Sequence, residues 1–280
     1  MSRYDELMGL RFPEFEHSYS PRDTILYALG VGAGADPLDP LELEHTFEER
    51  LKVIPSMAVT LAYPGFWYRN LPAGLDHVRV VHASERFEIH NPLPVAGTVV
   101  ARPSIVAIHD KGEGRGALVV SRREIRVKAS GLLLATVTQT AFCRGDGGMG
   151  GPVTSPPPPP HPVPERASDL QVEMPVSRRA ALIYRLSGDD NPLHLDPAFA
   201  RDAGFPAPIL HGLCTYGHIA RAILRNFCGE GSDLVMMDCR FTGAVYPGDT
   251  LAVDFWRDGE TVTFTAHAGG RKVIDNGEAR

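Results

Sequence analysis

A segment rich in glycine and proline divides this chain and limits what it can fold into. Residues 144–166 contain a run of glycines, then five consecutive prolines, then His-Pro-Val-Pro-Glu-Arg. Such a segment cannot form the interior of a helix or a central strand. The proline run predicts an extended conformation of about 3.1 Å per residue. It could serve as a proline-rich ligand for another protein, but we favour a linker between units at 1–143 and 167–280.

The two units resemble each other in sequence. Ser20-Pro-Arg-Asp-Thr-Ile-Leu-Tyr-Ala-Leu29 is similar to Ser177-Arg-Arg-Ala-Ala-Leu-Ile-Tyr-Arg-Leu186, at an offset of 157 residues (177 − 20). A second pair begins at Arg86-Phe and Arg240-Phe, at an offset of 154 residues (240 − 86). A gap of a few residues reconciles the offsets, so the sequence predicts a duplicated domain.

Strand patterns follow the position of a central helix in both units. Runs rich in β-branched residues, partly alternating in polarity, are separated by short gaps with Gly, Pro or Asp, which is typical of β-strands. The predicted strands are residues 78–82, 85–89, 98–108, 117–128 and 132–142, then 234–241, 250–256, 261–266 and 272–275.

The polar residues that suggest chemistry lie in the second unit, in Gly188-Asp-Asp-Asn-Pro-Leu-His194. Gly188 allows a sharp bend, and Asn191-Pro192 favours a turn over continued helix. We therefore expect Asp189 and His194 on an irregular segment, where a carboxylate and an imidazole beside one cavity can move protons near neutral pH. The alternative is that Asp189 stabilises a turn and His194 caps the next helix.

A second stretch, Phe205-Pro-Ala-Pro-Ile-Leu-His-Gly-Leu-Cys-Thr-Tyr216, leads into an apolar run that ends at Phe227. The run predicts a helix that begins at Gly212. Free backbone N–H groups and the helix dipole favour negative charge at that position. The alternative is that Gly212 only starts the helix.

The first unit lacks these groups. It has Asp36-Pro-Leu-Asp39 opposite Asn191-Pro-Leu-His194, and Ile54-Pro-Ser-Met57 opposite Leu210-His-Gly-Leu213. Because both the imidazole and the glycine at the helix start are missing, we expect the first unit to be catalytically silent.

Three stretches resemble the hydratase segment of the MaoC-like dehydratases, most closely the (R)-specific, type-2 enoyl-CoA hydratases. They are Gly188–His194, Ala203-Gly-Phe205 and Ile209-Leu-His-Gly-Leu-Cys-Thr215. The resemblance implies an α+β fold of two tandem hot-dog units, each a curved antiparallel sheet wrapped around a central helix.

The resemblance also implies a reaction, the reversible hydration of a trans-2-enoyl-CoA to the (3R)-3-hydroxyacyl-CoA. Asp189 and His194 would hold the water and exchange its protons, in roles that the sequence leaves open. Asn191 would orient the water or Asp189, and the Gly212 N–H would stabilise the thioester oxygen. We expect no metal ion and no cofactor, since CoA is part of the substrate.

Residues that touch the acyl-CoA are also implied by the resemblance. They are His82 with Ala83, where the family has His-Gly, Lys111 in an Asp-Lys-Gly turn, and Phe241 after an arginine. The alternative for Lys111 is a plain hairpin tip, since Lys111-Gly-Glu-Gly-Arg-Gly116 joins two strands and opens no helix. The alternative for Phe241 is a core aromatic.

Two rival functions share the fold or ligand. A hot-dog thioesterase usually has a carboxylate on or near its central helix, and residues 213–227 contain neither Asp nor Glu. A non-catalytic acyl-thioester-binding subunit is disfavoured by the intact Asp189, Asn191, His194 and Gly212.

Composition narrows the partners and the compartment. A net charge of -6 argues against a nucleic-acid-binding surface. No apolar run approaches the ~20 residues of a membrane span, and the N-terminus lacks a signal-peptide core.

The four cysteines show no Cys-x-x-Cys spacing, which indicates reduced thiols. The C-terminus is not a Ser-Lys-Leu address. We expect a cytoplasmic enzyme, either a homodimer or a pseudo-dimeric monomer.

Overall fold

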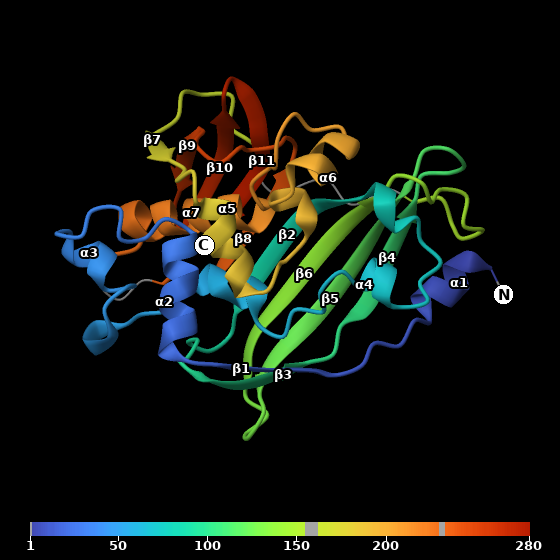
Figure 1. The fold of residues 1–280 in the computed structure, drawn as a ribbon, viewed down its shortest axis with the longest axis horizontal. Coiled ribbons are helices and arrows are strands. Elements are labelled where there is room, and N and C mark those ends of the chain that lie inside the picture. Colours follow the sequence, from blue (N-terminus) through green and yellow to red (C-terminus); the bar gives the residue numbers. More distant parts are fainter. Residues whose placement is uncertain (1, 155–161, 230–232) are drawn as a thin grey trace.

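The computed structural model describes residues 2–154, 162–229 and 233–280. The predicted extended proline run lies outside the described residues. Within them, eleven strands join into one antiparallel sheet (Figure 1). The strands are β1 Phe15–Tyr19, β2 Val80–Ile89, β3 Gly97–Ala101, β4 Ser104–Asp110, β5 Ala117–Val127, β6 Leu133–Cys143, β7 Leu170–Pro175, β8 Met236–Phe241, β9 Thr250–Asp258, β10 Thr261–Ala268 and β11 Arg271–Ala279.

The order of the strands repeats in mirror image about the middle of the sheet. The order is β1-β3-β5-β6-β2-β8-β11-β10-β9-β7, and β4 pairs with β5 outside this path. Each strand of the first half except β4 therefore has a counterpart in the second at the same distance from the β2–β8 junction. This topology is the tandem hot-dog arrangement that the resemblance implied.

The register of β2 against β8 shows how the two halves are related by symmetry. Glu85 on β2 lies opposite Cys239 on β8, and the two are separated by 154 residues, the offset that relates Arg86 to Arg240. Each is thus paired with its own counterpart, so an approximate twofold axis passes between them. Tyr27 and Tyr184, counterparts at the offset of 157, also meet, with ring centroids 6.0 Å apart.

Helices cover the concave side of the sheet. The α-helices are α1 Arg3–Met8, α2 Pro21–Gly30, α3 Pro40–Leu43, α4 Trp67–Asn70, α5 Ala180–Tyr184, α6 Pro197–Asp202 and α7 Gly212–Phe227. The 3₁₀ helices are η1 Glu48–Arg50, η2 Pro55–Thr60, η3 His77–Arg79, η4 Arg185–Ser187 and η5 Pro192–His194. The counterparts α2 and α5 pack side by side (Figure 1).

The predicted helix of the second half is confirmed as α7, which starts at Gly212. Its side chains are buried along most of its length, from Leu213 to Ile223. Proline at 206 and 208 keeps the preceding segment out of helix. The end of α2 closes against it, because the Cys214 thiol donates to the Gly30 carbonyl at 3.3 Å.

The first half has no comparable helix among its described residues, which corrects the expectation of a central helix in each unit. The matching segment is the six-residue η2, with Pro55 in its first turn. The chain leaves helical geometry at the extended Leu61, Ala62 follows with a φ of 46°, and Pro64-Gly65 prevents a return to helix.

Several predicted strand limits are also wrong. Residues 98–108 form two strands, because Pro103 between β3 and β4 has no N–H for the ladder. The strands predicted at 78–82 and 85–89 are one, β2, with an irregularity between His82 and Ser84. The last strand extends from Arg271 to Ala279. The pattern missed β1 and β7, the two ends of the strand order.

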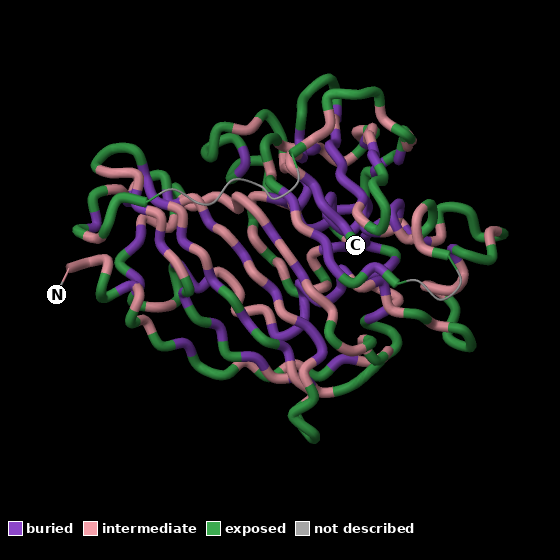
Figure 2. Tube along the Cα trace, turned by 180° about the vertical axis from the view of Figure 1, so that it is seen from behind, coloured by how far each residue is buried: buried purple, intermediate pink, exposed green. Residues whose placement is uncertain are grey.

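Two apolar clusters stabilise the structure. The larger joins both halves through α7, η2 and the facing sides of the strands. The smaller lies in the first half, where Trp67 and Phe12 pack against β4, β5 and β6, and it also includes Met149 of the following segment. Buried residues follow alternate strand positions and concentrate where the halves meet (Figure 2).

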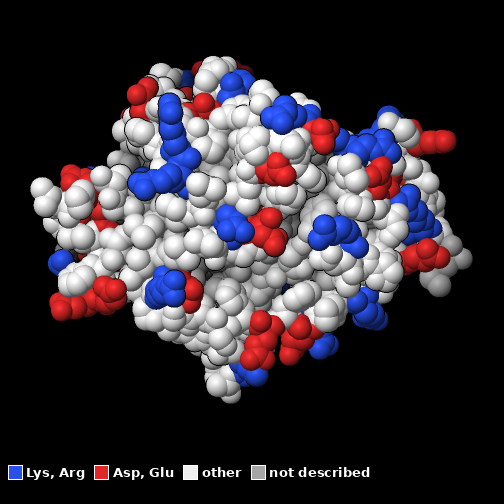
Figure 3. Space-filling model, viewed as in Figure 1, with Lys and Arg blue, Asp and Glu red and all other residues white. Residues whose placement is uncertain are grey.

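The surface view in Figure 3 shows acidic and basic side chains interspersed, without a large patch of one sign. Across the described ranges, no helix has the length and apolar character needed to cross a bilayer.

Gly217 provides a test of how the halves are joined. A Cβ at this position would lie 2.3 Å from Val31 Cγ1, so Gly217→Ala should destabilise the protein by about 1–3 kcal/mol through overpacking. Val31→Ala in the same chain should recover part of that loss. Urea unfolding of the three variants measures it, and a wild-type midpoint for Gly217→Ala alone would contradict this packing.

Candidate active site

The segment from Gly188 to His194 forms the irregular loop that the sequence predicted. Gly188 ends η4 with a φ of 113°, a conformation that favours glycine. The Asn191 N–H donates to Asp189 Oδ1 at 3.3 Å, and Asn191 Oδ1 accepts from the Leu193 N–H at 3.1 Å. Asn191 thus holds Asp189 through its backbone, while its side chain caps η5.

His194 lies against His211, which immediately precedes α7. The ring centroids are 3.8 Å apart, with 30° between the ring planes. His194 Nδ1 lies 3.0 Å from the Ile209 carbonyl, and His211 Nε2 lies 3.1 Å from the Asp189 carbonyl. A carbonyl only accepts, so each of these nitrogens carries a proton. In the neutral rings the lone pairs are therefore on His194 Nε2 and His211 Nδ1.

Both rings are held in the neutral form. Burial lowers the pKa of His194, and the nearby Asp189 carboxylate opposes that shift only in part. Burial, followed by the neighbouring His194, lowers the pKa of His211 to about 3. A neutral imidazole with a free Nε2 is equipped to accept a proton.

The Asp189 carboxylate and the two imidazoles bring a ligand atom each within 4.8 Å of one another. This set has the composition of a metal site, but its geometry is unfavourable. The two rings are stacked with their centroids 3.8 Å apart, whereas a metal bound by both imidazoles would lie close to the plane of each ring. The arrangement fits a small polar molecule between the groups better than a metal ion.

Gly212 places the first turn of α7 beside this cluster. The first N–H groups of a helix have no partner inside it. A Cβ on Gly212 would lie 3.2 Å from a ring carbon of Phe241, so glycine allows Phe241 to cover the helix start. Phe241 in turn packs against His82, with centroids 4.7 Å apart. Three of the predicted residues are therefore in one place.

In the first half, the residues that correspond to Tyr184 and Gly212 are hydrogen-bonded to each other. Tyr27 donates from its hydroxyl to Ser56 Oγ at 2.8 Å, and both residues are buried. Their counterparts are Tyr184 and Gly212. Since glycine offers no hydroxyl, the buried Tyr184 hydroxyl has no hydrogen-bond partner. At this duplicated position the hydroxyls are hydrogen-bonded to each other in the first half, whereas the second half leaves the Tyr184 hydroxyl without a partner.

The two remaining predicted acyl-CoA contacts are Ala83 and Lys111. Ala83 sits at the β2 irregularity beside His82. Lys111 occupies the β4–β5 hairpin, with its ammonium 4.5 Å from the Phe142 ring centroid. Among the described residues, no hydrogen bond, ion pair or ring contact links Lys111 to the other predicted site residues.

Sequence reasoning missed His211 and Tyr63. His211 belongs to the Leu-His-Gly motif, so its position beside Gly212 was the available signal. Tyr63 lies in the loop after η2; burial raises the pKa of its phenol, and Asp189 and Glu85 add to that shift. Only the fold reveals that Tyr63 is near Asp189.

Two family models match the chain side by side. The model described as "MFE-2 hydratase 2 N-terminal domain" matches residues 17–145, and the "MaoC like domain" model matches residues 161–277. Enoyl-CoA hydratase ChsH3 of Mycobacterium tuberculosis is 39% identical over 282 residues, covering 95% of this chain and 93% of that protein. The chain belongs to the MaoC-like hydratase family.

Other members show how widely the same two-unit chain occurs. The 3-hydroxyacyl-thioester dehydratase Y of M. tuberculosis is 40% identical, with 92% and 91% of the two chains covered. Enoyl-CoA hydratase 2, peroxisomal, of Arabidopsis thaliana is 34% identical, with 93% and 89% covered. The crystal structure of a MaoC-like dehydratase from Phytophthora capsici superposes with a TM-score of 0.85 at 29% identity, covering 99% and 97%.

The neutral, buried His211 predicts how stability depends on pH. Its folded pKa is depressed below the usual 6.5, so below pH 6.5 the unfolded chain binds a proton that the folded chain does not. Stability should therefore fall as pH decreases from about 6.5, by roughly 1.4 kcal/mol per pH unit for this group.

Urea unfolding at a series of pH values tests this. His211→Gln keeps a donor for the Asp189 carbonyl and removes the titration, so its stability should vary less between pH 6.5 and pH 5. An unchanged pH dependence in this variant would show that His211 titrates normally.

Proposed function

We propose that this protein catalyses the reversible hydration of trans-2-enoyl-CoA thioesters to (3R)-3-hydroxyacyl-CoA. The observation that carries the proposal is the convergence of Asp189, His194 and the start of α7 beside the junction of the two halves. Relatives of nearly the same length named enoyl-CoA hydratase and 3-hydroxyacyl-thioester dehydratase support it.

The proposed chemistry uses the geometry directly. Water held by the Asp189 carboxylate and His194 Nε2 attacks C3 of the enoyl group, while charge moves onto the thioester oxygen. The Gly212 N–H at the start of α7 donates to that oxygen. A donor aimed at developing charge is typically worth ~100- to 1000-fold in rate.

Proton movement follows from the neutral histidine. His194 takes the proton of the attacking water at Nε2, because its Nδ1 proton is held by the Ile209 carbonyl. The same pair of groups then delivers a proton to C2, so the catalyst ends in its starting state. Asn191 holds the carboxylate through its backbone. In this mechanism no metal ion or cofactor is needed.

The thioesterase alternative lacks support in the site. Such an enzyme usually has a catalytic carboxylate on or near the central helix, and α7 contains neither Asp nor Glu. The carboxylate near its start is Asp189, which comes from the preceding loop.

The remaining assignments are part of the proposal. His82, Ala83 and Phe241 would contact the acyl-CoA next to the reacting groups, and Lys111 would contact it from the hairpin. The joined β2 and β8 support a pseudo-dimeric monomer, with a homodimer as the alternative. The four free cysteines support a cytoplasmic location.

Removing either proton-transfer group should abolish most hydration. Asp189→Asn and His194→Gln are each expected to lower kcat by ~100-fold or more, because each removes a group that moves a proton. Asp190→Asn is the matched control, since Asp190 is exposed and adjacent. Loss of enoyl absorbance measures the rate; near-wild-type turnover by a folded Asp189 or His194 variant would refute the assignment.

The reaction type can be separated from hydrolysis in the same cuvette. Crotonyl-CoA should lose its enoyl absorbance without release of free thiol, and chiral analysis should give the (3R) product. Stoichiometric thiol release, detected with a disulfide dye, would favour the thioesterase instead.

A further inference from the structure

The concave face of the first half carries a row of buried polar side chains. Glu85, Gln139 and Ser121 lie directly opposite one another on β2, β6 and β5. Arg123 follows two residues after Ser121 on the same face. All four are buried, with exposed fractions of 1%, 7%, 7% and 4%. We call these four residues the inner polar band.

The inner polar band separates the smaller apolar cluster from the part of the larger cluster that lies in the first half. Val119 and Ala141, on the hairpin side of the band, belong to the smaller cluster, while Val137 and Ile125, on its other side, belong to the larger. A carboxylate and a guanidinium buried at this boundary have a large desolvation cost unless they are paired and hydrogen-bonded.

The two charges of the band are only partly satisfied. Glu85 Oε2 lies 2.8 Å from His82 Nε2, but Glu85 Oε1 is buried without a partner. Arg123 donates from Nη2 to the Val59 carbonyl at 2.6 Å, but Arg123 Nε is buried without a partner. Neither residue forms an ion pair with the other. The band thus contains one acceptor and one donor without partners, both covered by protein atoms, and the Tyr63 ring lies over the Arg123 guanidinium with its centroid 5.7 Å from Cζ.

The band adjoins the proposed site. Burial raises the pKa of the Tyr63 phenol, the charges of Asp189 and Glu85 raise it further, and Arg123 opposes the shift. Burial raises the pKa of the Tyr184 phenol, which has no hydrogen-bond partner, and the charges of Asp189 and Glu85 add to that shift. A second connection runs from Glu85 through His82 to Phe241, which covers Gly212.

The order of residues along the strands indicates which part of a substrate would reach the band. Lys111 lies at the hairpin end of β4, His82 lies opposite Ala141 on β6, and Glu85 and Arg123 lie progressively farther from that hairpin. If the CoA moiety lies at Lys111 and the thioester at Gly212, as in the proposed function, the band faces the acyl group beyond the reacting carbons.

We infer that this site selects 2-enoyl thioesters whose acyl group carries a neutral hydrogen-bonding substituent, a hydroxyl or a carbonyl, beyond the double bond. This inference rests on the proposed function. A hydroxyl can donate to Glu85 Oε1 or accept from Arg123 Nε, whereas a plain alkyl chain would leave both atoms unsatisfied. A carboxylate is disfavoured because Glu85 already balances the charge of Arg123.

The experiment compares matched substrates. The full-length protein is assayed with trans-2-enoyl-CoAs of graded chain length, each prepared with a methyl, a hydroxyl or a carboxylate at its far end. At one length or a narrow range of lengths, kcat/KM for the hydroxyl form should exceed that for the methyl form by about 10- to 100-fold, as expected for a hydrogen bond to a charged group.

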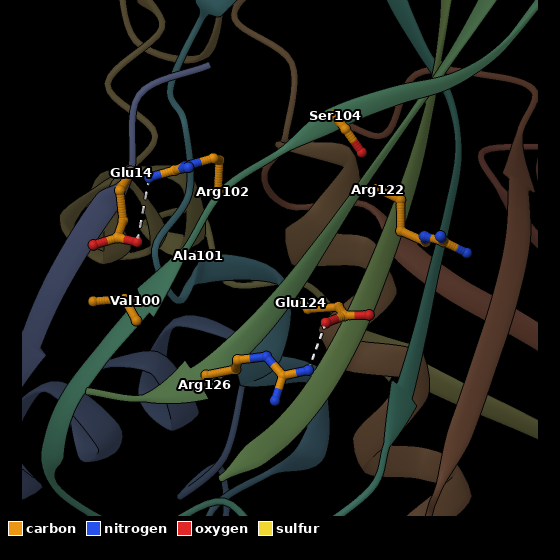
Figure 4. Close-up of a pocket in the computed structure, with 8 residues that line it drawn as sticks. All are labelled: Glu14, Val100, Ala101, Arg102, Ser104, Arg122, Glu124 and Arg126. Atoms are coloured by element: carbon orange, nitrogen blue, oxygen red, sulfur yellow. Dashed lines mark hydrogen bonds and ion pairs between the residues drawn. The ribbon is translucent and has the colours of Figure 1, made fainter. Parts of the chain in front are cut away.

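Two variants test whether the inner polar band causes the preference for the hydroxyl substrate. Arg123→Met should bring the hydroxyl-to-methyl ratio close to one. Arg122→Met is the matched control and should keep the wild-type ratio. Arg122 is the preceding residue of β5, but its side chain lies on the opposite face of the sheet, in a depression of about 330 Å³ that also contains Arg126 (Figure 4).

The outcomes separate the two proposals. If no enoyl-CoA is hydrated, the proposed function fails. If hydration occurs but methyl and hydroxyl forms react equally at every length, the inference is overturned and the band has a purely structural role. A preference for the carboxylate form would overturn the requirement for a neutral substituent. Because the wild-type ratio alone decides, the test does not depend on whether Arg123→Met folds.

Discussion

The backbone hydrogen bonds between β2 and β8 are the interaction on which the structure depends. They join two half-sheets into one and bring the loop of Asp189 and the start of α7 next to strands of the other half. Without this pairing, each half would present an unpaired strand edge, and the contact between Phe241 and His82 would be lost.

Unequal helices give the two halves different roles. In the second half α7 fills the concave face of its sheet and supplies the helix start at Gly212. In the first half η2 is too short to do so, and polar side chains remain on the sheet beneath it. In the proposed reaction, the second half would supply the reacting groups, and the buried polar side chains of the first half would face the acyl group.

The sequence predicted most of the fold and much of the site. The proline-rich segment, the repeat offsets and the strand patterns gave the two-unit sheet, since each depends on local residue properties. The motif spacing placed Asp189, His194 and Gly212 correctly relative to their loop and helix. The features that the sequence did not predict depend on contacts between residues that are far apart in the chain. Strands β1 and β7 are short and pair on one side only, and the stacking of His211 on His194 exists only in the folded chain.

The opposition of Glu85 and Cys239 has an evolutionary consequence. In a dimer of identical subunits, a position on the twofold axis must face a second copy of itself, so a glutamate there would place two carboxylates together in the interior. The two units of this protein are free of that restriction, because they belong to one chain and differ in sequence. The buried Glu85 carboxylate therefore lies opposite the Cys239 thiol and not opposite a second carboxylate.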